Sequence, residues 1–337
     1  DELKETNGSY TYRRDSSGIP FINNPDVSYK DPQNGKNVYL TIDRTIQTFL
    51  EESMSQVAEQ YTPERMIGIV ADAKTGEILA MSTRPTFDLN TRVGLGDNWT
   101  NDAISSRFEP GSTMKIFTLA AAIEEGLYND SEYFQSGSYA VGRDRIRDHN
   151  RSGWGQITFA EGVQRSSNVA FAILAERLGA DKLLDYLYSF GLNEKTGIDL
   201  PDEAGSIFNY HYKIEQITTA FGQGTAITPI QQIQAATAIA NNGKMMQPYI
   251  IDKIVDPDTG KIIEDKKPVL KGEPVSADTA RKVLDVLEST VTEQAGTARH
   301  YSIEGYRVAA KTGTAQISNP NGPGYLSGRG EYIYSVL

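Results

Sequence analysis

The sequence predicts an α/β protein of the α+β type, in which an antiparallel sheet is flanked by helices. Two stretches, 66–82 and 249–271, each contain two strand-like runs joined by a tight turn, and such hairpins are antiparallel. Segments such as 43–60 and 276–292 place apolar residues on one side of a helix. Hydrophobic residues make up 39% of the chain and charged residues 23%, which is typical of a soluble globular protein.

Composition excludes several classes of function. The 337 residues allow one large domain or two, and the net charge of -11 argues against a nucleic-acid partner and a basic membrane-binding patch. The chain has no cysteine, so disulfides, thiolate chemistry and zinc-thiolate sites are excluded. His149, His211 and His300 are scattered and are most simply surface or turn residues, so we predict no metal and no cofactor. No apolar run reaches the length of a membrane span, and no signal peptide opens the chain.

The N-terminal third begins with a polar, turn-rich stretch and continues into regular elements. Residues 1 to about 36 read as the tail of an earlier domain or as an extended arm. Residues 38–42 are strand-like, and Asp43 can cap a helix that runs to about Gln60. The first hairpin follows, with Lys74-Thr75-Gly76 at its turn.

The stretch from Glu109 to Lys115 precedes an apolar, helix-forming run that ends before Gly126. Ser112 therefore lies on the first turn of a helix, and Lys115, three residues later, shares its face. A serine hydroxyl becomes a nucleophile when a neighbouring base takes its proton, and a neutral lysine can be that base. The helix N-terminus adds N–H groups that favour a developing oxyanion.

The rest of the chain alternates helices with short strands. Residues 127–158 are predicted to be loop with short strands, and residues 159–178 form a helix in two pieces, broken at 165–168. Further elements are predicted as helices at 182–190, 229–239 and 276–292, a second hairpin at 249–271, and strands at 306–310 and from 331 to the end.

Two further motifs carry chemistry in context. Ser166-Ser167-Asn168 offers a hydroxyl and an amide at the break between two helices, although taken alone it is more simply an ordinary helix N-cap. Lys-Thr-Gly occurs at Lys74, Lys195 and Lys311, and only the last ends an apolar strand. There Gly313 should lie on a sheet edge where a ligand backbone can come close.

Ser-x-x-Lys, Ser-x-Asn and Lys-Thr-Gly in this order resemble the motif set of β-lactamases and penicillin-binding proteins. The chain resembles the transpeptidase domain of class B penicillin-binding proteins over roughly residues 36–337. Several further sequence segments are also similar to that family, at residues 40–47, 72–81, 84–88, 221–224 and 228–229. The resemblance implies the penicillin-binding-protein/serine β-lactamase-like fold.

The resemblance also implies roles for individual residues. Ser112 is the expected acylated nucleophile and Lys115 its base, Ser166 and Asn168 serve proton transfer and substrate positioning, and Lys311 supports the Ser166 hydroxyl. The backbone N–H groups of Ser112 and Thr314 are expected to form the oxyanion hole. Residues expected to contact substrate are Ser167, Thr312, Gly313, Thr314 and Gln316. His149 follows Arg147-Asp148 where some relatives carry tryptophan, so the groove shape there is expected to differ.

As a member of this family, the chain would be a peptidoglycan D,D-transpeptidase that cross-links stem peptides ending in D-Ala-D-Ala and is acylated by β-lactams. Expected partners are a membrane-embedded glycan polymerase and division or elongation proteins. The expected place of action is the extracytoplasmic face of the bacterial plasma membrane, with an anchoring N-terminal segment outside this chain.

The domain prediction follows from the same resemblance. Residues 1–36 would end a non-catalytic pedestal domain or linker, and residues 37–337 would form the transpeptidase domain. The family's last strand and helix are expected to be missing from this chain. That strand would lie between the strand beginning at Glu331 and the strand beginning at Met66.

Three alternatives share the same motifs. A serine β-lactamase needs a deacylating base, such as the Glu-x-x-Leu-Asn pattern, and no such match follows Ser166. A β-lactam sensor domain would remain acylated. An inactive scaffold is disfavoured because every motif side chain is intact. Turnover on peptidoglycan separates these alternatives from a transpeptidase.

Overall fold

The computed structural model divides the chain into two units, each built from two stretches of sequence. The first combines Asp1–Thr41 with Tyr249–Lys267, and the second combines Ile42–Pro248 with Pro268–Leu337. This division differs from the predicted boundary at residue 36, because the second hairpin pairs with the strand at Asn37–Leu40. The structure describes residues 2–12, 14, 16–17, 19, 28–96, 99–317, 319, 322, 324–326 and 331–337.

The first unit is built from paired strands. β1 (Ser9–Thr11) pairs antiparallel with β2 (Ser28–Lys30), so the polar N-terminal stretch forms an extended ladder. β13 (Ile251–Val255) lies between β3 (Asn37–Leu40) and β14 (Ile262–Asp265). The turn between β13 and β14 confirms the predicted hairpin tip, since the Asp256 carboxylate accepts from two backbone N–H groups within it.

Two antiparallel ladders organise the second unit. β4 (Met66–Ala71) pairs with β5 (Ile78–Arg84), as predicted, and β16 (Thr312–Gln316) pairs with β17 (Tyr332–Val336). The predicted sheet is therefore divided: in the described part of the chain, β4 pairs only with β5 and β17 only with β16.

The strand predicted at 306–310 begins later than expected. Residues 307–310 belong to no strand, and β16 starts at Thr312, after the lysine of the motif. The Ala310 carbonyl accepts a hydrogen bond from the Thr290 hydroxyl at 2.6 Å, so a side chain takes the place of a strand partner. Lys311 is the first residue whose backbone pairs with the C-terminal strand segment, through Leu337.

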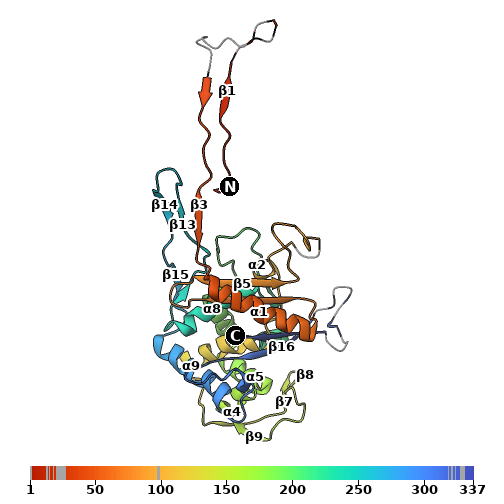
Figure 1. Cartoon of the computed structure of the whole chain (residues 1–337). Coiled ribbons are helices and arrows are strands. Elements are labelled where there is room, and N and C mark those ends of the chain that lie inside the picture. Colours follow the sequence, from red (N-terminus) through yellow and green to blue (C-terminus); the bar gives the residue numbers. More distant parts are fainter. Residues whose placement is uncertain are drawn as a thin grey trace. The chain divides into compact units, whose positions relative to one another are not determined.

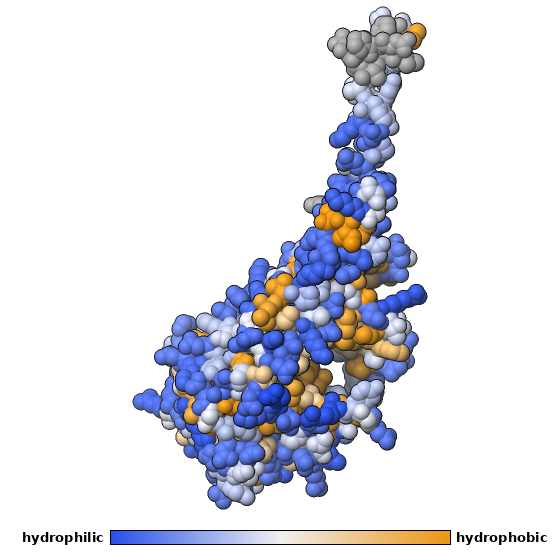
Figure 2. All heavy atoms as spheres, turned by 90° about the vertical axis from the view of Figure 1, so that its left-hand side faces the viewer, coloured by the Kyte–Doolittle hydropathy of each residue, from blue (hydrophilic) through white to orange (hydrophobic). Residues whose placement is uncertain are grey.

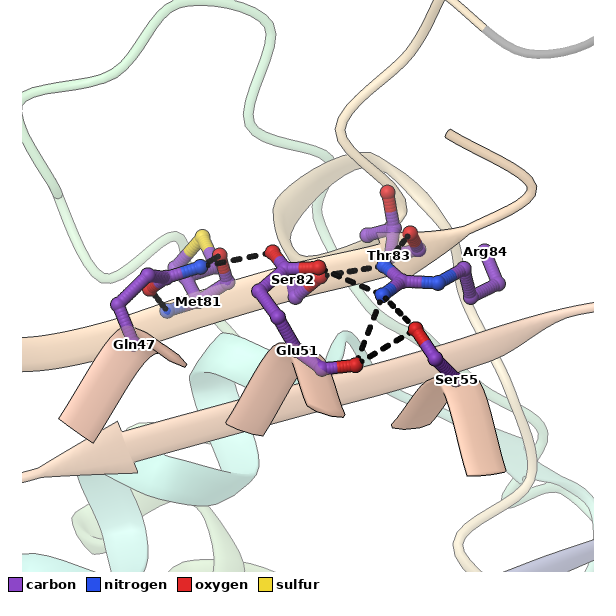
Figure 3. Close-up of polar contacts among 7 residues, drawn as sticks. All are labelled: Gln47, Glu51, Ser55, Met81, Ser82, Thr83 and Arg84. Carbon is purple, nitrogen blue, oxygen red and sulfur yellow. Dashed lines mark hydrogen bonds and ion pairs between the residues drawn. The ribbon is translucent and has the colours of Figure 1, made fainter. Parts of the chain in front are cut away.

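Helix α1 (Arg44–Tyr61) lies along β5 and closes its outer edge (Figure 1). Asp43 caps the helix, as predicted. The Gln47 amide pairs with both backbone groups of Met81, at 2.9 and 3.0 Å, and so replaces a neighbouring strand (Figure 3). Arg84 adds an ion pair to Glu51 at 2.6 Å.

The helices of the second unit surround α3, whose residues from Lys115 to Ala122 are all buried. Aromatic rings pack beside it, with Phe117 and Phe190 at a centroid distance of 5.1 Å. The break predicted at 165–168 is confirmed, since it separates two helices. The remaining helices are α2 (Asp102–Ser105), η1 (Gly111–Met114), α3 (Lys115–Glu124), α4 (Phe159–Gln164), α5 (Asn168–Leu178), α6 (Ala180–Ser189), α7 (Lys213–Thr219), α8 (Pro229–Ala240), α9 (Ala277–Thr292) and η2 (Arg299–Tyr301).

Short strand pairs connect these helices, and the 127–158 loop contains four such strands. The pairs are β6 (Tyr133–Gln135) with β9 (Gln156–Thr158), β7 (Ser138–Val141) with β8 (Asp144–Arg147), β10 (Ile207–Phe208) with β11 (Thr225–Ala226), and β12 (Met245–Met246) with β15 (Leu270–Gly272). Figure 2 shows a face on which hydrophilic side chains predominate and hydrophobic ones form separate patches. Among the described residues, none of the helices is long and apolar enough to cross a membrane.

Candidate active site

Ser112 lies in the 3-10 turn η1, which is held between β16 and the loop that follows α7. The N–H of Gly111 donates to the Gly222 carbonyl at 3.1 Å. Gly222 has a φ of +79°, and a Cβ at this position would overlap the backbone of Gly111. Because Gly222 has no side chain, the loop can approach and support the turn that carries Ser112.

Lys115 begins α3 directly after this turn and is 1% exposed. Its Nζ donates to the Ser166 carbonyl at 2.7 Å and to Asn168 Oδ1 at 2.8 Å, and it lies 3.2 Å from Ser166 Oγ. Within the described residues no hydrogen bond joins Lys115 to the Ser112 hydroxyl. Such contacts are commonly long before substrate binds.

The surroundings of Lys115 favour its neutral form. Burial lowers its pKa well below the ordinary value, the charge of Lys311 lowers it further, and Asp148 opposes the shift. A neutral amine has two N–H groups, which the Ser166 carbonyl and Asn168 Oδ1 can both accept. The lone pair of Lys115 Nζ then remains available to accept a proton from a hydroxyl group, as a general base requires.

Ser166 occupies the break between α4 and α5 in an uncommon backbone conformation, with a φ of +57°. Backbone bonds from Ser166 to Val163 and from Ser167 to Gly162 close the end of α4 and hold this conformation. The Ser166 hydroxyl accepts from Lys311 Nζ at 2.7 Å and lies 3.2 Å from Lys115 Nζ. It therefore lies between two buried amines, positioned to relay a proton.

Lys311 is the one lysine of the three Lys-Thr-Gly motifs that the structure brings to this site. Its side chain is 0% exposed, and burial lowers its pKa to about 7. Its Nζ also donates to the Thr312 carbonyl at 2.9 Å. Lys74 and Lys195 are exposed in turns, in agreement with the choice made from sequence context.

Strand β16 presents two different faces. Thr312, Thr314 and Gln316 lie on the more exposed face, and the Thr312 hydroxyl donates to the Thr297 hydroxyl at 3.2 Å. Gly313 is buried, and a Cβ there would overlap the Ser335 hydroxyl and lie 2.9 Å from the Pro110 carbonyl. The absence of a side chain at Gly313 therefore lets the strand pack on the Ser112 turn, a contact that the sequence did not predict.

The side chain of Ser167, which was expected to contact substrate, points into the protein. Ser167 is 0% exposed, and its hydroxyl donates to Asp148 at 2.8 Å while it accepts from the Ala170 N–H as the N-cap of α5. Consecutive residues of a turn point in different directions, and here the middle one points into the protein. Ser167 therefore supports the Ser166 turn from the interior of the protein.

Sequence reasoning did not identify Asp148 as a site residue. Its carboxylate is 2% exposed and accepts from the Ser167 hydroxyl, the Val169 N–H and the Gly137 N–H at 2.8 to 3.1 Å. It therefore ties the Ser166 turn to the β7–β8 hairpin, whose last residue, Arg147, accepts from Asn168 through its carbonyl. A lone Asp in a polar loop carries no sequence signal for this role.

His149 and Glu109 also lie beside the site. Partial burial and then the charge of Lys115 lower the pKa of His149, whose ring contacts Trp154 at a centroid distance of 5.3 Å. His149 is exposed and lies in a turn, as the sequence predicted. Glu109 precedes the Ser112 turn and accepts from the Tyr325 hydroxyl at 3.1 Å, and burial raises its pKa.

Comparison with known proteins agrees with this arrangement. Residues 66–335 match the family model described as the penicillin binding protein transpeptidase domain. Among relatives, stage V sporulation protein D of Bacillus subtilis is 40% identical over 323 residues, covering 94% of this chain and 50% of the relative. Penicillin-binding protein PbpB of Mycobacterium tuberculosis is 35% identical over 329 residues, covering 94% and 48%. The chain spans about half the length of these relatives.

Two solved structures are also similar. Penicillin binding protein 2X from Streptococcus thermophilus superposes with a TM-score of 0.89 at 30% identity, covering 99% of this chain and 51% of that one. Penicillin binding protein 3 from Mycobacterium tuberculosis, complexed with ampicillin, gives a TM-score of 0.79 at 33% identity, covering 88% and 68%. The predicted fold is confirmed by these likenesses.

Proposed function

The chain belongs to the penicillin-binding protein transpeptidase family, of the class B type, and from this premise we propose that it is a serine-type peptidoglycan D,D-transpeptidase. Its substrate would be a stem peptide ending in D-Ala-D-Ala. One observation carries the proposal: the Ser166 hydroxyl lies between the buried amines of Lys115 and Lys311, next to the turn that holds Ser112.

In the first half of the reaction, Ser112 Oγ attacks the carbonyl carbon of the penultimate D-alanine. Lys115, neutral because it is buried, takes the hydroxyl proton. The N–H groups of Ser112 and Thr314 stabilise the oxyanion of the tetrahedral intermediate. The C–N bond then breaks, and the proton reaches the departing amine through Ser166.

The substrate carboxylate would be held by Lys311 and by the hydroxyls of Thr312 and Thr314 on the exposed face of β16. Asn168 has one N–H in a bond to the Arg147 carbonyl, which leaves the second N–H to orient the peptide. Gln316, further along the same face, would line the groove beyond it.

In the second half, an amine from a neighbouring stem peptide attacks the ester of Ser112. The product is a cross-link, and Ser112 recovers its proton. β-Lactams resemble the D-Ala-D-Ala terminus and would acylate the same serine, but their opened ring blocks this second step. Action at the extracytoplasmic face of the membrane, beside a glycan polymerase and division or elongation proteins, follows from the family as a further proposal.

A product assay tests this function. The protein is incubated with a pentapeptide ending in D-Ala-D-Ala and an amine acceptor, and released D-alanine and cross-linked product are measured together. A transpeptidase forms both, with Ser112→Ala inactive. Rapid hydrolysis of penicillin without cross-linking would identify a β-lactamase instead, and permanent acylation without peptide turnover would identify a sensor.

A further inference from the structure

A cavity of about 630 Å³ borders the Ser166 turn and has no part in the acylation site described above. One wall is α4 with the residue that follows it, Arg165, and the other is the turn after α9 at residues 293–295. Arg165 directly precedes Ser166. Two residues beyond this second wall, the Thr297 N–H donates to the Gln164 carbonyl at 3.1 Å, and the Thr297 hydroxyl accepts from Thr312. The cavity therefore adjoins both the Ser166 turn and the start of β16.

The position of Ser166 relates this cavity to the second half of the reaction. If Ser166 passes the proton to the departing amine, the leaving nitrogen lies beside its hydroxyl. The attacking nitrogen must occupy the same place, because forward and reverse transfers pass through one transition state. The rest of the acceptor molecule then extends past Ser166, on the side where D-alanine departed. The cavity lies next to this position.

The lining of the cavity is polar and carries one excess negative charge. Arg165 pairs with Glu161 at 2.7 Å and lies over the Trp154 ring at 5.3 Å, so its charge is compensated. Glu293 is exposed and forms no ion pair within the described residues. The side-chain amides of Gln164 and Gln294 also line the cavity. Gln164 Nε2 donates to the Ser289 hydroxyl at 3.2 Å, and amide groups of this kind are suited to peptide groups.

We propose that this cavity is the acceptor subsite, which receives a polar stem peptide whose attacking amine arrives protonated. This inference rests on the proposed function of the Ser112 site. Glu293 attracts the ammonium group as the acceptor enters. The ammonium then loses one proton to solvent, and the neutral amine nitrogen bonds to the acyl carbon. The ester bond to Ser112 Oγ breaks, and a second proton from the nitrogen passes through Ser166 to Ser112 Oγ.

Comparing two acceptors of different length distinguishes an effect on acceptor binding in the cavity from an effect on the reaction at Ser112. Isotopically labelled D-alanine is a small amine that leaves the cavity empty, and its label distinguishes the aminolysis product from the donor peptide. An N-acetylated stem tripeptide with a free lysine ε-amine would occupy the cavity. With one D-Ala-D-Ala donor peptide, the measured quantity is the ratio of aminolysis to hydrolysis for each acceptor. Acylation by penicillin is followed in parallel as a readout of the Ser112 site.

Ala295→Phe places a phenyl ring in the cavity, and Glu293→Gln removes its unpaired charge. With the tripeptide, we expect the ratio to fall about tenfold or more in Ala295→Phe and about threefold in Glu293→Gln. With D-alanine, both ratios should change less than about twofold. Glu304→Gln, an exposed acid outside the cavity, is the matched control and should behave as wild type.

Equal loss with both acceptors, or no loss with the tripeptide, would overturn the subsite. If Ala295→Phe does not fold, the ratio of aminolysis to hydrolysis in Glu293→Gln tests the subsite on its own. If wild type is acylated by penicillin but forms no aminolysis product with either acceptor, the proposed transpeptidase function is wrong and the subsite falls with it. If wild type catalyses aminolysis but the variants affect both acceptors equally, only the subsite assignment is refuted.

Discussion

Replacing Lys115 examines the proposed proton acceptor. Lys115→Arg keeps a positive charge and hydrogen-bond donors near Ser166, but a guanidinium stays protonated throughout the accessible pH range. Lys115→Met is close in size and has no nitrogen, and it leaves two acceptors, the Ser166 carbonyl and Asn168 Oδ1, without their donor. Each lost partner costs about 1–3 kcal/mol, offset by the amine no longer being buried.

Both variants should lose acylation by about 10² to 10⁴-fold, as expected for a positioned general base. That loss corresponds to roughly 3–5 kcal/mol in the activation barrier. In wild type the acylation rate should rise with pH, because the neutral form of Lys115 increases, and it should do so through a pKa below that of free lysine. Both variants should lack this rise.

The assay is stopped-flow acylation by a chromogenic β-lactam between pH 5 and 10, with thermal unfolding recorded for each protein. Lys74→Arg and Lys195→Arg, at the two exposed copies of the Lys-Thr-Gly motif, are matched controls and should acylate as wild type does. If folded Lys115→Arg acylates at the wild-type rate, Lys115 is structural and another group activates Ser112.

Three further predictions follow from the geometry. Ser166→Ala should lower the acylation rate about 10²-fold or more, whereas Ser167→Ala should cost about 1–2 kcal/mol of stability through the lost cap and keep acylation within a few-fold; the opposite ranking would reverse their roles. Gly222→Ala should lower the melting temperature and acylation together, since its Cβ overlaps Gly111, and a wild-type melting curve would refute this. Because burial lowers the pKa of Lys311 to about 7 in the folded protein, its charged form lowers the free energy of unfolding by the full amount below pH about 7. This loss should disappear as the pH approaches about 10.4, where Lys311 is also neutral in the unfolded chain. Lys311→Met should therefore raise the melting temperature at pH 7 more than at pH 10, and a pH-independent difference would contradict the shift.

Local signals in the sequence were sufficient for much of the fold. Asp43 has the side chain of a helix cap, and the helix starts beside it; the polar run at 165–168 breaks a helix, and the chain does break there. Lys311 was chosen over two identical tripeptides because it ends an apolar run, and it is the copy that reaches Ser166. Each of these inferences depends on residues close in sequence.

Features that depend on distant partners could not be predicted in the same way. Ser167 turns inward because Asp148, nineteen residues earlier, offers it a buried carboxylate. Gly313 is a glycine because Pro110 and Ser335 approach it, and the strand there starts late because Thr290 binds the Ala310 carbonyl. No periodicity or motif encodes such tertiary contacts, so the sequence alone misassigned these positions.

Mapping the site of penicillin acylation tests the central claim most directly. The protein is incubated with penicillin, digested, and analysed by mass spectrometry over time. The account predicts one adduct, on the peptide that contains Ser112, which persists long after free penicillin is removed and is absent from Ser112→Ala. An adduct on another residue of the folded protein, or no adduct at all, would contradict it.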